Sequence, residues 1–254
     1  LLYFRAAGNG RFKKGIFLKD GQGREIECGM FPETVSWNGN GVEDIVTGDL
    51  FGRLFHLKNL GMKNGIPVFE KKGPIINDRE MVELVPCAAT EGNGAVLFCG
   101  NANGEIKVYR KKGGTGDRPV FDEGTYLEMD DAWIARMMPL ASYTDVNGDG
   151  KCELLSGDER GHIYLYRNLG TDRNPVFSGG RRLKDETGSV IKIAGGPDPM
   201  RPDDGYSKPV AADISGGGKK DLLTGTGLGR IFFFKNTGTD PGGYPCFARG
   251  VVLK

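Results

Sequence analysis

The apolar residues of this chain come in short runs, and clusters of Gly, Asn, Asp and Pro separate the runs. The segments 163–166 and 231–234 are apolar at every position. A strand with this pattern is covered on both faces, because its side chains alternate between them. Glycine accounts for 42 of the 254 residues, far above the usual ~7%, and 14 Phe with 8 Tyr argue against disorder. The pattern predicts many short strands joined by tight turns.

The same pattern recurs along the chain. Its copies occupy residues 36–69, 90–121, 145–177 and 213–247. Each copy ends on a phenylalanine, and successive closing phenylalanines are 52, 56 and 70 positions apart. A half copy, "LLYFRAAGNGRF" at residues 1–12, matches only the later part of a unit. Repetition of this kind indicates a repeat architecture.

Each copy is predicted to form four strands. In the last copy the first strand is the small-residue segment "PVAAD", and the second is "DLLTG". The third strand is of the type "HIYLYRN", and the fourth is expected to begin at "PVF". Solenoid repeats are shorter, and sandwiches lack strict internal repetition. Four-stranded units of this kind, repeated around an axis, predict a β-propeller.

The predicted fold class is all-β: a β-propeller of four-stranded antiparallel blades, with four full blades plus a half blade in one domain. The chain is expected to start in a third strand and to stop in a fourth, as part of a larger ring. The expected blades are residues 1–29 (partial), 30–83, 84–136, 137–206 and 207–254.

One copy carries a distinctive motif. Residues 145–177 read D-x-N-G-D-G-x-x-E-L-L-x-G-x-x-x-G-x-I-x-x-Y-x-N-x-G, and the copy at 213–247 is close to it. This motif resembles the FG-GAP/VCBS repeat, which builds the propellers of integrin α-chains and of many secreted bacterial proteins. The resemblance implies an extracellular or cell-surface location. Because such propellers usually have seven blades, it also implies additional blades or a partner chain that closes the ring.

The same motif begins with a candidate calcium loop. Acid or amide side chains occupy its first, third, fifth and ninth positions, a glycine stands at the sixth, and hard oxygen ligands suit Ca²⁺. An EF-hand needs a glutamate at the twelfth position, where Ser156 stands. The loop resembles the calcium hairpin of integrin-type blades, with one structural Ca²⁺; the alternative is a hairpin of Asx-turns. The candidate ligands are Asp145, Asn147, Asp149, Glu153 and the carbonyl of Lys151.

Two insertions, at residues 129–139 and 194–209, are expected on the face where propellers bind ligands. Their arginines could grip a carboxylate, and their aromatic rings could stack on a sugar. The alternative is an ordinary solvated loop. The candidate ligand-binding residues are Trp133, Arg136, Arg201 and Tyr206.

The sequence predicts different environments for the two histidines. His56 aligns with Val108, Leu165 and Phe233 of the other copies, which predicts a buried, packed side chain. His162 opens its third strand near the candidate ligand face, so it is the histidine with possible chemistry; a surface polar role is the alternative.

Bulk properties exclude some function classes. The formal net charge is +1, without the basic excess of a nucleic-acid-binding protein, and no apolar run approaches the ~18 residues of a membrane span. The chain starts without Met, and no signal peptide is visible. Five cysteines match no zinc spacing and are expected to be structural thiols, which do not decide the compartment.

Two functions stay open on the sequence alone. The first is a non-catalytic binding or scaffold module for a glycan or a protein. The second is a secreted polysaccharide lyase or glycoside hydrolase that acts on acidic polysaccharide. A lyase needs a base, an acid and a cation that neutralises the substrate carboxylate. The candidate catalytic residues are His162, Tyr206, Arg136 and Arg201.

Overall fold

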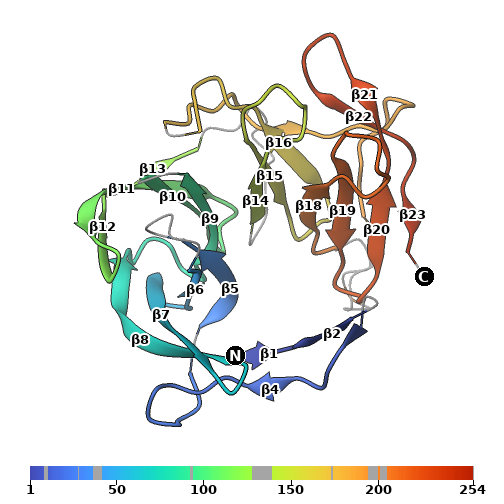
Figure 1. Ribbon diagram of the computed structural model, residues 1–254. Helices are drawn as coiled ribbons and strands as arrows, with labels where there is room; N and C mark the ends of the chain where they lie inside the picture. Colours follow the sequence, from blue (N-terminus) through green and yellow to red (C-terminus); the bar gives the residue numbers. More distant parts are fainter. Residues whose placement is uncertain are drawn as a thin grey trace.

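The protein is described by a computed structural model, shown as a ribbon in Figure 1. The described residues are 1–8, 11–27, 29–36, 42–91, 94–127, 139–172, 174–193, 200 and 205–253. Within these ranges the chain is all-β and contains no helix, and no segment forms a helix able to cross a membrane. Four antiparallel sheets are arranged around an axis as propeller blades, which confirms the predicted fold class.

Each sheet is built from one repeat. Blade 1 contains β5 (Met30–Val35), β6 (Asp44–Gly48), β7 (Arg53–Lys63) and β8 (Ile66–Asn77). Blade 2 contains β9 (Val85–Glu91), β10 (Gly94–Gly100), β11 (Ile106–Thr115), β12 (Arg118–Phe121) and β13 (Thr125–Tyr126). Blade 3 contains β14 (Leu140–Thr144), β15 (Glu153–Gly157), β16 (Ile163–Tyr166) and β17 (Arg181–Arg182). Blade 4 contains β18 (Lys208–Ala212), β19 (Asp221–Gly225), β20 (Ile231–Phe234) and β23 (Val251–Val252), with the hairpin β21 (Asn236–Thr239) and β22 (Pro245–Phe247) at its rim.

A half blade precedes these sheets. It contains β1 (Leu2–Tyr3) paired with β4 (Ile16–Phe17), and between them the hairpin of β2 (Ala6–Gly8) and β3 (Arg11–Phe12). In Figure 1 it lies between blade 1 and blade 4. The first strands β5, β9, β14 and β18 contact one another in that order around the axis.

The core lies between blades, because strands that are apolar on both faces touch two neighbours. In blade 3, Leu154 and Tyr166 are paired and pack against blade 2, whereas Leu155 and Leu165 are paired and pack against blade 4. All four side chains are fully buried. Complete burial of such a side chain contributes roughly 1.5–3 kcal/mol to the free energy of unfolding, so the interfaces between blades stabilise the whole row of blades.

The closing phenylalanines occupy equivalent places. Each is paired with the residue three positions after the site that aligns with His56: Phe69 with Asn59, Phe121 with Lys111, Phe177 with Asn168 and Phe247 with Asn236. Three of these rings are buried, and Phe177 is half-buried against Phe98. The register predicted for the repeats is therefore confirmed.

The structure differs from the prediction in where the fourth strand begins. In blades 2 and 3 the "PVF" segment, and in blade 4 its counterpart "PCF", lies in a hairpin at the rim, and the fourth strand follows it as β13, β17 or β23. The hairpins of blades 2 and 4 contain a register shift, between Lys111 and Gly113 and between Asn236 and Gly238; blade 1 also has register shifts, although its β8 is continuous. A bulge of this kind bends a strand away from its sheet.

Four of the five cysteines are described, and none of them forms a disulfide. Cys87 and Cys99 are buried between blades, where burial raises the pKa of both thiols. They therefore behave as small apolar side chains.

Candidate functional site

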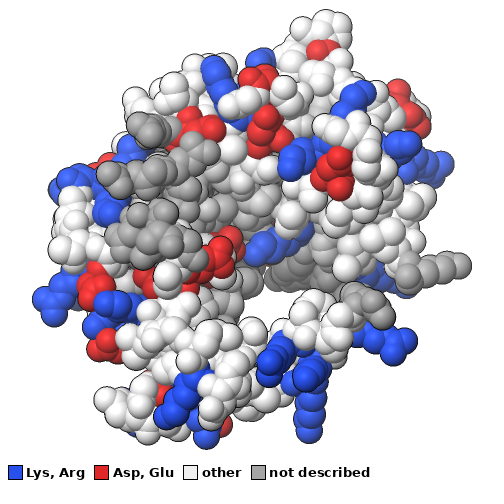
Figure 2. Space-filling model, in the orientation of Figure 1, with Lys and Arg blue, Asp and Glu red and all other residues white. Residues whose placement is uncertain are grey.

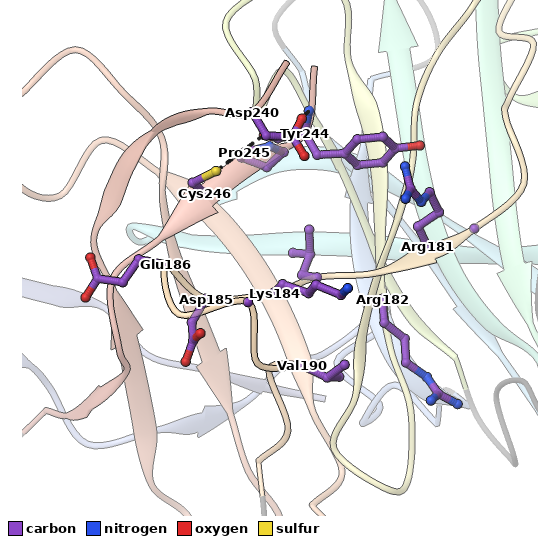
Figure 3. A pocket seen from close by; sticks show the side chains of 13 residues that line it. Arg181, Arg182, Lys184, Asp185, Glu186, Val190, Asp240, Tyr244, Pro245 and Cys246 are labelled. Carbon is purple, nitrogen blue, oxygen red and sulfur yellow. Dashed lines mark hydrogen bonds between the residues drawn. The ribbon is translucent and has the colours of Figure 1, made fainter. Parts of the chain in front are cut away.

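A groove of about 640 Å³ opens at the rim between blades 3 and 4. One wall is the segment from Gly180 to Val190, which contains β17, and the other is the hairpin of β21 and β22 (Figure 3). The volume falls within the range of small-molecule sites, roughly 300–1,000 Å³.

Tyr244 is the aromatic residue of this groove. Its backbone is fixed by Asp240, whose side chain accepts the Tyr244 N–H at 2.8 Å and whose own N–H donates to the Tyr244 carbonyl at 2.8 Å. The Arg181 guanidinium lies 4.5 Å from the ring centroid, and the Arg167 guanidinium lies 5.5 Å from it. Such cation–π contacts hold an arginine side chain in one place. The ring therefore positions Arg181 at the edge of the groove.

Charges are divided between the two ends of the groove. Figure 3 shows Arg181, Arg182 and Lys184 on one side, and the carboxylates of Asp185 and Glu186 on the other. Asp185 is already engaged, because Thr187 and Ser189 donate to its Oδ1. The bond from the Thr187 hydroxyl is the main reason that its pKa is lowered. The cationic end is therefore the end suited to an anionic group.

Elsewhere the surface charge is mixed. On the face shown in Figure 2, Lys and Arg side chains are interspersed with Asp and Glu side chains. The groove is mixed in the same way, because Asp185, Glu186 and Asp240 line it as well as Arg181, Arg182 and Lys184, so recognition of an anion there would be local to the cationic end.

Arg182 connects the groove to the turn that precedes the third strand of blade 3. Its Nε donates to the Tyr164 hydroxyl at 3.4 Å, and this hydroxyl donates to Asp158 at 3.2 Å. Burial, together with the charge of Asp158, raises the pKa of Tyr164, although Arg182 opposes the shift. The backbone N–H of His162 donates to Asp158 Oδ1 at 2.8 Å, and the imidazole Nδ1 of His162 lies 3.4 Å from Asp158 Oδ2. Asp158 thus organises both neighbouring side chains.

The structure brings the segments of His162 and Tyr206 together. The carbonyl of Glu159 accepts the N–H groups of Gly205 and Tyr206 at 2.7 and 2.9 Å, and the Ser207 hydroxyl donates to the His162 carbonyl at 2.9 Å. Tyr206 has a φ of 48°, in the left-handed region that non-glycine residues rarely adopt. Such strain persists where the surroundings enforce it, often at functional positions.

Three other residues predicted for this face lie outside the described residues: Trp133, Arg136 and Arg201. Their contribution to a ligand site stays a prediction. His56 is fully buried, as its alignment predicts, and its Nε2 lies 2.8 Å from Asp44 Oδ2.

The candidate calcium loop is a hairpin between β14 and β15 that is closed by its own side chains. Asp145 accepts the N–H groups of Gly148 and Gly150, at 2.7 and 3.0 Å. Asp149 Oδ1 accepts the Lys151 N–H at 3.0 Å. These are Asx-turn hydrogen bonds. The geometry of the loop is therefore compatible with both interpretations, a calcium-binding hairpin and a hairpin held by Asx-turns alone.

Glu153 has the most unusual environment in this loop. Its side chain is fully buried, and it accepts the Val146 N–H at 3.0 Å and the Asn147 side-chain N–H at 3.3 Å. Burial raises its pKa to about 7, and the nearby charges of Asp149 and Asp145 add to the shift. A cation at the loop would relieve this repulsion.

Two observations weigh against a preformed metal site. Among the described residues, no group of three or more His, Cys, Asp or Glu side chains is gathered closely enough to hold a metal ion. A cavity of about 150 Å³ beside the loop is also lined by Lys219 and Lys220 of blade 4, whose charges oppose a cation. Calcium binding at this loop stays a prediction.

The groove was not found by sequence reasoning, which placed the ligand face at residues 129–139 and 194–209. Arg181 and Tyr244 are 63 positions apart, and no motif joins them in the sequence. The repeat pattern gave no signal for the groove, because it does not place the rim of one blade against the rim of the next.

Comparisons with known proteins add the following. No protein-family model matches the chain, and no curated protein matches it. Among solved structures, it is similar to a chain of the Tc holotoxin pore of Photorhabdus luminescens, with 13% sequence identity and a TM-score of 0.29. That match covers 100% of this chain and 15% of the other, so the chain spans a small part of the length of the protein it resembles.

Proposed function

We propose that this protein is a non-catalytic binding module of the β-propeller type, and that its ligand carries a carboxylate or similar anionic group. The observation that supports this proposal is the groove between blades 3 and 4, where Arg181, Arg182 and Lys184 lie on one side and Arg181 packs against the Tyr244 ring. A guanidinium can hold a carboxylate through two parallel hydrogen bonds.

An acidic glycan is the ligand class that fits the groove best. The groove has a volume of about 640 Å³, and its cations lie along one wall rather than at a single point. An acidic protein segment is the second class, because a chain of Asp or Glu side chains would present similar groups.

The test is a binding screen of uronic-acid oligosaccharides, matched neutral oligosaccharides and an acidic peptide, measured by calorimetry. The proposal expects saturable binding of at least one anionic ligand and none of the neutral ones. Arg181→Gln should weaken that binding by about 1.5–3 kcal/mol, the range for a hydrogen bond to a charged group.

Arg230→Gln is the matched control, because Arg230 is an exposed arginine in a turn of blade 4 and does not line the groove. Equal loss of binding in both variants would indicate a general charge effect. Binding that is unchanged by Arg181→Gln would contradict the assignment of the groove.

Two further properties are proposed on the resemblance of the repeats to FG-GAP/VCBS propellers. The first is a structural Ca²⁺ held by Asp145, Asn147, Asp149, Glu153 and the Lys151 carbonyl, which the buried carboxylate of Glu153 supports. The second is an extracellular or cell-surface location, which fractionation of the native cells would test: recovery only from the cytoplasm would contradict it.

Catalysis on acidic polysaccharide is the alternative function. It is favoured by one observation, the backbone bonds that hold the turn before His162 against the segment of Tyr206. The candidate roles are His162 and Tyr206 as base and acid, with Arg136 or Arg201 as the neutralising cation. New ultraviolet absorbance from unsaturated chain ends, after incubation with uronic-acid polysaccharides, would support a lyase, and its absence across the screen would contradict one; new reducing ends without that absorbance would support a glycoside hydrolase.

A further inference from the structure

The groove between blades 3 and 4 has a structural counterpart between the half blade and blade 1. A turn follows β17 in one place and β4 in the other, and an aspartate of each turn pairs with the closing phenylalanine of the next blade: Asp185 with Phe247, and Asp20 with Phe69. Both turns close with the same backbone bond, which the N–H of the aspartate donates to the residue four positions later, at 2.9 and 2.8 Å. The two junctions share one backbone framework, so their side chains can be compared position by position.

Some side chains are the same at both junctions, and they maintain the framework. Asp20 and Asp185 each accept the backbone N–H groups of the residues two and four positions later. Arg5 and Arg167 also correspond, and each guanidinium packs against a glycine in the rim hairpin of the next blade. A Cβ at that glycine would lie 3.1 Å from the Arg5 guanidinium and 3.0 Å from that of Arg167. The presence of these side chains at both junctions is explained by their role in folding.

Four other residues of the groove differ from their counterparts, which are apolar or glycine. The pairs are Arg181 and Ile16, Arg182 and Phe17, Glu186 and Gly21, and Tyr244 and Ile66. Because the same framework forms without the polar groups of these four side chains, folding does not require them. They are the residues that give this groove its own chemistry, whereas Lys184 corresponds to another lysine, Lys19.

Glu186 is the one of these four residues that binding of an anion does not explain. It lines the groove on the side away from Arg181 (Figure 3). Its backbone is anchored, because its N–H donates to the Phe247 carbonyl at 2.7 Å, whereas no hydrogen bond or ion pair within the described part of the chain engages its carboxylate. The other carboxylates of the groove, those of Asp185 and Asp240, accept backbone N–H groups in their own turns. Glu186 therefore offers a negative charge to a ligand.

The backbone of the groove walls is already engaged. In one wall the N–H groups of Asp185, Glu186 and Gly188 donate to carbonyls of the protein, and in the other wall the N–H of Tyr244 donates to the Asp240 side chain. A peptide that binds as an extended strand relies on main-chain hydrogen bonds to its partner. These walls instead present side chains, which suits a ligand that carries its charges and hydroxyl groups on sugar rings.

We propose that the ligand is a zwitterionic oligosaccharide, in which uronic acids alternate with amino sugars that carry a free, protonated amine. This inference rests on the proposed function and specifies its ligand. Arg181 and Arg182 hold the carboxylate, and Glu186 holds the ammonium group at the other end of the groove. Arg182 and Glu186 are four positions apart, so their Cα atoms are separated by at most about 14 Å, and one short oligosaccharide meets both. Opposite charges at the two ends fix the direction of the ligand.

The test compares, by calorimetry with the full chain, different forms of one oligosaccharide of alternating glucuronic acid and glucosamine: with free amines, with N-acetylated amines, and with the carboxyl groups reduced to alcohols. The free-amine form should bind about two- to fivefold more tightly than the N-acetylated form, the range for an exposed ion pair. The reduced form should bind most weakly. Added salt should diminish the preference for the free amine, because salt screens exposed charges. Glu186→Gln should bind the free-amine and N-acetylated forms with equal affinity.

Glu123→Gln is the matched control, because Glu123 is exposed in blade 2 and does not line the groove, and it should keep the preference. Glu186→Gln should unfold at the temperature of the parent chain, since the equivalent turn forms with Gly21. If no anionic form binds, the proposed function falls together with this inference. Equal binding of the free-amine and N-acetylated forms, or a preference that Glu186→Gln retains, would overturn the inference alone. A peptide of alternating Asp and Lys that binds where the oligosaccharides do not would overturn the assignment to a sugar.

Discussion

The ring of Tyr166 lies against the backbone of Gly180, so closely that a Cβ at Gly180 would be 2.6 Å from two ring carbons. The same contact joins Phe4 with Gly15, Tyr109 with Gly124 and Phe234 with Gly250. In each case the aromatic residue belongs to the third strand, and the glycine precedes the fourth. The missing side chain of the glycine is what lets the fourth strand pass over the ring.

This contact predicts the effect of Gly180→Ala. The added methyl group must displace a fully buried ring, and overpacking of this kind costs typically about 1–3 kcal/mol. Urea unfolding of the variant measures the loss. Gly73→Ala is the control, because nothing lies within 4 Å of a Cβ at that position. Equal stabilities of the two variants would contradict the packing described.

The pair of His56 and Asp44 predicts a second loss of stability. Asp44 accepts from the Asn59 N–H at 2.7 Å, and its other oxygen lies 2.8 Å from the buried imidazole of His56. Asp44→Ala removes both interactions and should cost about 1–3 kcal/mol, the penalty of an unsatisfied buried group. Thermal unfolding checks this. Glu43→Ala, at an exposed neighbouring position, should change little, and a similar loss there would refute the explanation.

The proposed calcium loop predicts a melting temperature that depends on calcium. Binding to the folded state alone stabilises it by about 2.7 kcal/mol when free calcium is about 100-fold above Kd. A chelator should therefore lower the melting temperature of the parent chain but not that of Asp149→Ala. Asp213→Ala, in the corresponding loop of blade 4, should keep the full response. A metal-free protein whose melting curve ignores both calcium and chelator would leave the hairpin a set of Asx-turns.

The contact of Asp78 with blade 2 predicts an acid-sensitive contribution to stability. Burial opposes ionisation of Asp78, but hydrogen bonds from Lys107 Nζ at 2.6 Å and from the Tyr109 hydroxyl at 2.8 Å outweigh it, so its pKa is lowered below 3.8. Between the folded and unfolded pKa values the unfolded chain binds more protons. The contribution is thus present above pH ~4 and is lost as the pH falls below it.

Asp78→Asn should therefore lower the unfolding free energy at neutral pH and flatten its decline in acid. Chemical unfolding between pH 3 and pH 7, compared with the parent chain, measures both effects. Asp122→Asn is a useful comparison, because Asp122 accepts the backbone N–H groups of Arg110 and Gly124. If the unfolding free energy of Asp78→Asn falls as steeply in acid as that of the parent chain, other carboxylates determine the acid dependence of stability.

Much of the fold could be predicted from the sequence, because each blade is a local structure. The apolar runs, the turn glycines and the closing phenylalanines recur within single repeats, so the four blades, their first three strands and the equivalent places of the closing phenylalanines followed from comparing copies. The buried place of His56 followed from the same comparison, since its counterparts are apolar.

The rim and the groove depended on tertiary structure. The "PVF" segments of blades 2 and 3 and the "PCF" segment of blade 4 lie in rim hairpins, whereas the "PVF" of blade 1 is part of its fourth strand, and the repeat pattern does not distinguish these cases. The ring of Tyr244 contacts the guanidinium of Arg181 because the rims of blades 3 and 4 lie side by side. The repeat pattern predicts which faces of a blade are apolar. Whether such a face is buried depends on packing between segments that are distant in the chain: the equivalent side chains of Ile163 and Ile231 are buried and exposed, respectively.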